Sequence, residues 1–164
     1  MKILTINSQN VGRKLREEKM EIRQNWSPVK LKAVDDQDLQ VFSQCLFESI
    51  VIPSEINFEE DKQRFAMAIE RFTWEHAKNK SHLLMQVLSI LVINYVEKVD
   101  LQNIYNNYKI KNILSISNID NNILIMLNDH EVITLKVKKC FCLLEDIGKP
   151  IYPAIIPTYS KNEL

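Results

Sequence analysis

The sequence predicts an α+β fold: a largely antiparallel β-sheet of seven to nine strands with two or three short helices. Three observations support this class. The chain of 164 residues is long enough for one domain with a core. Short apolar runs separated by turn residues recur along it, most clearly in residues 112–137. A capped amphipathic helix is expected over residues 35–47.

Composition excludes several classes of function. Hydrophobic residues make up 46% of the chain and charged residues 26%, which is typical of a folded domain and not of a disordered one. The only glycines are Gly12 and Gly148. Loops that bind phosphate through a glycine-rich backbone therefore have no residues from which to form.

Charge is distributed unevenly although the net charge is zero. Residues 1–30 carry seven basic against three acidic residues, and residues 31–75 carry four against ten. We expect residues 1–28 to be a basic N-terminal extension, helical or loosely ordered, residues 29–150 a single α+β domain, and residues 151–164 an extended tail containing proline. Nucleic acid is disfavoured as a partner, because the main body has no dense basic stripe.

Neither a membrane span nor an oxidising compartment is expected. The longest apolar stretch, residues 83–96, is shorter than the roughly 20 residues that a membrane helix needs, and it contains polar residues. Three cysteines (Cys45, Cys140 and Cys142) without a signal peptide fit a reducing compartment, so we predict a cytoplasmic protein.

The first elements of the domain follow from local patterns. Strands are expected at 29–34, at 49–53 and at 55–60, the second of them stopped by Pro53. In the helix over 35–47, Asp35 is the expected cap, and Leu39, Phe42 and Leu46 share one face.

Residues 64–75, RFAMAIERFTWE, fit a helix and a strand equally well. As a strand, Phe65, Met67 and Ile69 point to one face, whereas Phe72 and Trp74 fall on the other. A β-bulge near Glu70 and Arg71 would be needed to restore the phase.

The remaining elements show a repeated order. We expect a strand in 83–96, with a helix as the alternative, a short helix in 99–108, a three-stranded meander in 112–137, and a strand or short helix after residue 138. The triplet DLQ occurs at 38–40 and again at 100–102. This order suggests two pseudo-symmetric β-α-β-β-β halves, 29–75 and 83–138, and partial closure into a barrel is also open.

No catalytic residue, metal site or cofactor is predicted. Cys140 and Cys142 share a strand face and could bind zinc with His76, His82 or His130, but two core cysteines are the simpler interpretation. Cys45 lacks an identifiable basic partner and is expected to be a core residue. Adjacent carboxylates such as Asp35 and Asp36 suit a helix cap better than acid–base catalysis.

Four stretches carry a resemblance to a known family: LKAVDDQDLQVFSQCLFESIV, KQRFAMAIERFTWE, NDHEVITLKVKKCFCLLEDIG and the proline after them. They resemble the alphaproteobacterial family of domain of unknown function 2948 over about residues 29–153. Its most specific part is the pattern of Arg64, Phe65, Ala66, Arg71, Phe72, Trp74 and Glu75, and a second part is DIG at 146–148. The resemblance implies a strand with a bulge at 64–75, and it implies no reaction, ligand or catalytic residue.

The functional prediction is a small bacterial protein-binding or adaptor module without catalytic activity, whose partner and oligomeric state the sequence leaves open. Arg71, Trp74 and Glu75 are the candidate surface interaction cluster. The alternative for these residues is Trp74 as a second core anchor beside an Arg71–Glu75 ion pair.

The alternative function is an enzyme or small-molecule-binding protein with a pocket between sheet and helices, lined by groups such as His82, Arg71 or Cys45. A third hypothesis is that residues 1–28 tether the domain to nucleic acid or to an acidic partner.

Overall fold

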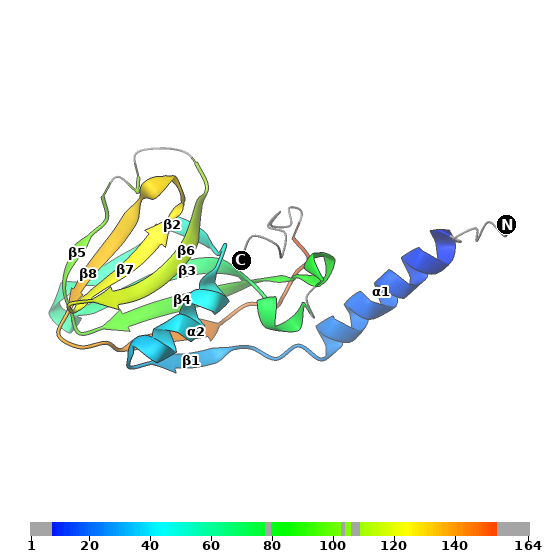
Figure 1. Cartoon of the computed structure of the whole chain (residues 1–164), viewed down its shortest axis with the longest axis horizontal. Helices are drawn as coiled ribbons and strands as arrows, with labels where there is room; N and C mark the ends of the chain where they lie inside the picture. The colour runs from blue at the N-terminus through cyan, green and yellow to red at the C-terminus, as the bar shows by residue number, and fades with distance from the viewer. Residues whose placement is uncertain (1–7, 78–79, 103, 106–108, 154–164) are drawn as a thin grey trace.

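A computed structural model describes residues 8–77, 80–102, 104–105 and 109–153 of the chain. Within these residues it contains two α-helices, nine strands and four short 3₁₀ helices (Figure 1). The α-helices are α1 (Ser8–Gln24) and α2 (Asp36–Leu46). The strands are β1 (Lys30–Ala33), β2 (Ile50–Glu59), β3 (Arg64–Phe72), β4 (Gln86–Asn94), β5 (Val96–Asp100), β6 (Lys111–Ile119), β7 (Asn122–Leu127), β8 (Val132–Val137) and β9 (Cys142–Asp146). The 3₁₀ helices are η1 (Glu60–Lys62), η2 (Trp74–His76), η3 (Ser81–Leu83) and η4 (Asn128–His130).

The strands form one antiparallel sheet in the order β1-β9-β4-β3-β2-β6-β7-β8-β5. This confirms the predicted α+β class. β2 and β6 are neighbours at the centre of the sheet. From there β3, β4, β9 and β1 follow on one side, and β7, β8 and β5 follow on the other. The predicted halves divide the chain differently, because they place β4 with the second half.

One core joins both halves of the sheet to α2. Phe65 and Met67 of β3, Ile113 of β6 and Ile125 of β7 belong to the same buried cluster as Phe42 of α2. The helix begins as predicted, since the Asp35 carboxylate accepts a hydrogen bond from the Asp38 N–H at 2.9 Å. Figure 1 shows α2 lying against the strands, whereas α1 extends away from them.

Pro53 does not end a strand. The predicted strands 49–53 and 55–60 are one strand, β2, whose pairing with β3 shifts register between Val51 and Ile56. A proline can lie inside a strand where such an irregularity removes the need for its N–H.

The bulge predicted near Glu70 and Arg71 is wrong. β3 pairs with β4 in unbroken register from Arg64 opposite Asn94 to Phe72 opposite Gln86. Without a phase change, Phe72 stays on the opposite face from the main core and packs in a small separate cluster with Ala77, Leu84 and Trp74. The same unbroken alternation places Arg71 on the core side.

Two further expectations concern the predicted short helix at 99–108 and the C-terminal tail. Residues 99 and 100 belong to β5, and residues 101, 102, 104 and 105 form no helix; residues 103 and 106–108 of the predicted helix lie outside the described part. Of the tail, residues 154–164 also lie outside it. No helix in the described residues is both long and apolar enough to cross a bilayer.

Candidate functional site

The first candidate site surrounds a buried arginine. Arg71 is the penultimate residue of β3, and none of its surface is exposed to solvent. A buried guanidinium needs acceptors for its five N–H groups, because an unpaired charge in a core is strongly destabilising. Two carboxylates and one backbone carbonyl supply them.

Asp146, the last residue of β9, forms the first pair. Arg71 Nε donates to Asp146 Oδ1 at 2.7 Å, and Arg71 Nη2 donates to Oδ2 at 2.8 Å. The same carboxylate accepts hydrogen bonds from the Ser89 hydroxyl at 2.7 Å and from the Val29 N–H at 2.8 Å. This buried carboxylate therefore connects β3, β9, β4 and the residue before β1.

Glu75 of η2 forms the second pair. Arg71 Nη1 donates to Glu75 Oε2 at 3.1 Å and Nη2 donates to Oε1 at 2.7 Å, while Nη1 also donates to the Phe72 carbonyl at 3.1 Å. The Glu75 side chain is 32% exposed, so it links the buried guanidinium to the surface. We call Arg71, Glu75, Ser89 and Asp146 the Arg71 network.

The network keeps Arg71 and Asp146 charged. Burial has the largest single influence on the pKa of Asp146 and raises it, but hydrogen bonds from Arg71, Val29 and Ser89, with the Arg71 charge, leave this pKa below its usual value. Burial likewise lowers the pKa of Arg71, but the hydrogen bonds that Arg71 donates to Asp146 and Glu75, with the charges of both carboxylates, more than compensate, so this pKa lies above its usual value.

The structure corrects one part of the predicted surface cluster. Arg71 and Glu75 are paired as the alternative interpretation expects, but Arg71 is buried and cannot contact a partner. Trp74 is half-buried, and its Nε1 donates to the Phe47 carbonyl at 2.9 Å, which attaches η2 to the end of α2. Interaction through Trp74 and Glu75 stays a prediction.

The other sequence candidates do not form a catalytic arrangement. Burial raises the pKa of the Cys45 thiol, with Arg71 only partly opposing it, so this cysteine is not activated as a nucleophile. The pKa of Cys142 is raised by a hydrogen bond with Cys140 and by burial. His82 lies in η3 with Nε2 4.0 Å from Glu18. Among the described residues, no group of three or more His, Cys, Asp and Glu side chains could hold a metal ion.

The second candidate site is a groove of about 380 Å³ between α2 and β6. It is lined by Asp36, Leu39, Gln40, Ser43 and Gln44 of the helix and by Ile116, Ser117 and Asn118 of the strand. Most of these side chains carry hydroxyl or amide groups, and Asp36 is the one ionisable group among the described residues that line the groove.

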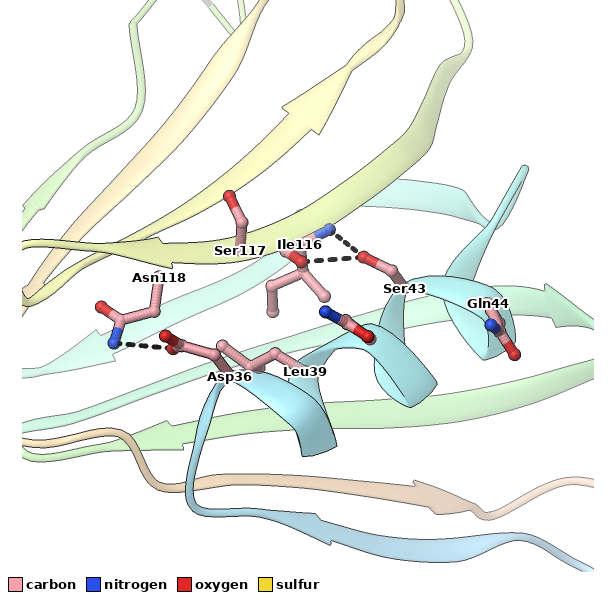
Figure 2. Close-up of a pocket in the computed structure, with 8 residues that line it drawn as sticks. Asp36, Leu39, Ser43, Gln44, Ile116, Ser117 and Asn118 are labelled. Atoms are coloured by element: carbon pink, nitrogen blue, oxygen red, sulfur yellow. Dashed lines mark hydrogen bonds between the residues drawn. The ribbon is translucent and has the colours of Figure 1, made fainter. Parts of the chain in front are cut away.

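Hydrogen bonds bridge the two walls of this groove (Figure 2). The Ser43 hydroxyl donates to the Ile116 carbonyl at 2.8 Å and accepts from the Ile116 N–H at 2.8 Å. It therefore occupies the position that a neighbouring strand would take. Asn118 Nδ2 donates to Asp36 Oδ1 at 3.3 Å, while Asn118 Oδ1 is buried and accepts no hydrogen bond within the described residues.

Replacing Ser43 with Ala is expected to lower the free energy of unfolding by about 1–2 kcal/mol, because it leaves the Ile116 N–H and carbonyl without their partner. Chemical denaturation measures the change. Ser117→Ala is the matched control, since Ser117 also lines the groove but its hydroxyl is not part of this bonded pair, and a change near zero is expected. Equal losses in both variants would contradict the role assigned to Ser43.

Sequence reasoning missed Asp146 and the groove. Asp146 stands 75 residues from its partner Arg71, so no local periodicity connects them. The one available signal is that both lie in stretches that carry the family resemblance, the second being DIG at 146–148. The groove has no comparable signal, since Gln40, Gln44 and Asn118 read as ordinary surface residues.

Comparison with known proteins gives one result. Residues 29–159 match the family model described as Protein of unknown function (DUF2948). Neither the curated proteins nor the solved structures contain a match to the chain.

Proposed function

We propose that this chain, which belongs to the DUF2948 family, binds an extended segment of a partner protein in the groove between α2 and β6. The main-chain groups of β6 would pair with the main chain of that segment, as in other cases of strand addition to a sheet edge. This makes the protein a binding or adaptor module.

The observation that carries the proposal is the open edge of β6. β2 pairs with β6 at Ile50–Asn112 and Val51–Lys111, and the main chain of the two residues before β2 bonds that of Ile113, although β6 continues to Ile119. Ser43 occupies the edge at Ile116. Beyond it, the edge has no strand partner among the described residues.

The next edge position is Asn118. Backbone groups of alternate residues in a strand point to the same side, so the N–H and carbonyl of Asn118 point to the α2 side, as those of Ile116 do. The pairing of β6 with β7 agrees, because the tight turn at residues 120–121 makes Ile119–Asn122 the closing pair of that hairpin. A peptide strand could therefore continue the ladder from Asn118.

The side chains of the groove suit a peptide main chain. Gln40 and Gln44 lie one helical turn apart on α2 and are exposed, and Asn118 lies across from them. Their amides can both donate to a peptide carbonyl and accept from a peptide N–H. The alternative of an enzyme pocket is less well supported, because His82, Arg71 and Cys45 are not among the described residues that line this groove.

The test compares the wild type with a variant in which two larger side chains fill the groove while the helix is kept. Peptides are selected on the full-length protein from a phage-displayed library of random sequences, and the affinities of the selected peptides are measured by fluorescence anisotropy. In the variant Gln40→Arg with Gln44→Arg, we expect affinity to fall by about tenfold or more, which corresponds to about 1.4 kcal/mol. Arg keeps helix propensity while its longer side chain occupies the groove.

Gln37→Arg is the matched control, because Gln37 is exposed on the same helix but does not line the groove. Hydrogen exchange supplies a second readout: the Asn118 amide is expected to exchange more slowly when the selected peptide is bound. The proposal fails if the library yields no binder, or if binders are unaffected by the double variant.

A further inference from the structure

A second surface lies on the far side of the sheet from α2. Along β3, Phe65, Met67 and Ile69 point into the core, so Arg64, Ala66, Ala68 and Glu70 point outward. α2 packs on the core side through Leu39, Phe42 and Leu46.

The outward side chains of neighbouring strands make a small apolar area. Ala66 lies opposite Val92 and Ala68 opposite Ile90 on β4, and Val92 in turn lies opposite Leu143 on β9. Leu88 and Leu143 are each 37% exposed, and the other apolar residues of this area are partly exposed. We call Ala66, Ala68, Leu88, Ile90, Val92 and Leu143 the outer face. Its two alanines allow another sheet to approach closely.

Charges of opposite sign stand at the two ends of the outer face. Arg64 begins β3 at one end, where its guanidinium and the Lys62 ammonium both pair with the carboxylate of Glu59. Glu70 stands at the other end, six residues or about 20 Å along the strand. Its carboxylate accepts a hydrogen bond from Gln86 Nε2 at 2.9 Å, which holds it on this face.

We propose that the outer face binds a second copy of this chain in a two-fold symmetric dimer. In an isologous interface each surface residue faces the position related to it by the axis. The two-fold axis would lie between the two packed sheets, run perpendicular to the strands and cross β3 between Ala66 and Ala68. It places Arg64 of each copy against Glu70 of the other. It also brings the alanines together, with Val92 and Ile90 beside them.

The charge pattern selects this axis over its alternative. An axis parallel to the strands would place Arg64 near Arg64 and Glu70 near Glu70 of the other copy, and like charges at an interface are unfavourable. A partner protein of unrelated sequence would not require Arg64 and Glu70 to lie at equal distances from one point on β3. A self-complementary surface does require this, because the axis must place each charge opposite a charge of the other sign.

Sedimentation velocity of the full-length protein over a concentration series tests the proposal. The wild type is expected to show a monomer–dimer equilibrium, and Arg64→Glu or Glu70→Arg alone is expected to raise the dimer dissociation constant by about tenfold or more. Mixing the two variants in equal amounts is expected to restore dimers, because each copy then offers the charge that the other lacks.

Lys136→Glu is the control, since it also breaks an ion pair, here with Glu97, but lies in β8, away from the strands of the outer face. It is expected to leave the dimer intact. Thermal unfolding by circular dichroism checks that every variant is folded. The proposal is overturned by a wild type that stays monomeric at all concentrations, or by a dimer that neither charge reversal weakens, or by mixed variants that remain monomeric.

Discussion

Replacing Arg71 with Met is expected to lower the free energy of unfolding by about 3–5 kcal/mol, the largest effect of any substitution considered for this chain. Met fills a similar volume, so the loss does not come mainly from a cavity. It comes from the carboxylate of Asp146, which would stay buried without its cation, and from Glu75, which would lose both hydrogen bonds that it accepts from the guanidinium.

Urea unfolding at neutral pH measures the change, and the same strand supplies a matched control. Arg64 also lies in β3 and pairs with a carboxylate, but its side chain is 42% exposed. Arg64→Met is therefore expected to cost about 1 kcal/mol or less. Arg71→Lys should fall between the two, because an ammonium keeps the charge and loses the paired geometry. If Arg71→Met and Arg64→Met cost the same, Arg71 does not organise this region.

The position of the Arg71 network explains why so much depends on it. Its hydrogen bonds join β3, β4, β9 and the start of β1, which are neighbours in one half of the sheet but distant in sequence. Through Glu75 it also positions η2, and Trp74 of η2 donates to the end of α2. The residues that carry the family resemblance near 71–75 and 146–148 therefore act in the structure of this chain as a buried support for α2 and hence for one wall of the groove.

Local signals were sufficient for a large part of this fold. The β6-β7-β8 meander was predictable because apolar runs alternate with turn residues, two of which, Asp120 and Asn121, adopt positive φ. α2 was predictable because Asp35 precedes an apolar stripe that reaches Phe42 and Leu46. In these segments the local pattern and the tertiary packing favour the same structure.

Prediction failed in β3, whose apolar side chains belong to two separate buried clusters. Bringing Phe72 into phase with Phe65, Met67 and Ile69 required a bulge. In the structure Phe72 packs in a second cluster with Ala77, Leu84 and Trp74, and the strand stays regular. Periodicity shows that a side chain is apolar, and it does not show which cluster receives it. For the same reason Arg71 was placed at the surface, because a charged residue is rarely buried without a partner, and its partner Asp146 is not visible from local sequence.

Changing Asp146 to Asn is expected to cost about 3 kcal/mol at neutral pH, and this cost should shrink in acid. The pKa of Asp146 in the folded protein is below its usual value despite burial. In the unfolded chain a carboxyl of this type has a pKa of about 3.9. The carboxylate therefore contributes its full stabilisation above about pH 4, and the contribution is lost as pH falls from there toward the lower pKa of the folded state.

Urea unfolding of the wild type and of Asp146→Asn from neutral pH to about pH 3 tests this, because urea adds no salt that would screen the ion pair. The difference between the two curves should be constant near neutral pH and narrow below about pH 4. Glu75→Gln is the control: its carboxylate pairs with the same guanidinium but is partly exposed, so its neutral-pH cost should be about 1 kcal/mol or less. A difference for Asp146→Asn that widens in acid would mean that this carboxyl is protonated more readily in the folded protein than in the unfolded chain, and the assignment of Asp146 as the charged partner of Arg71 would then be wrong.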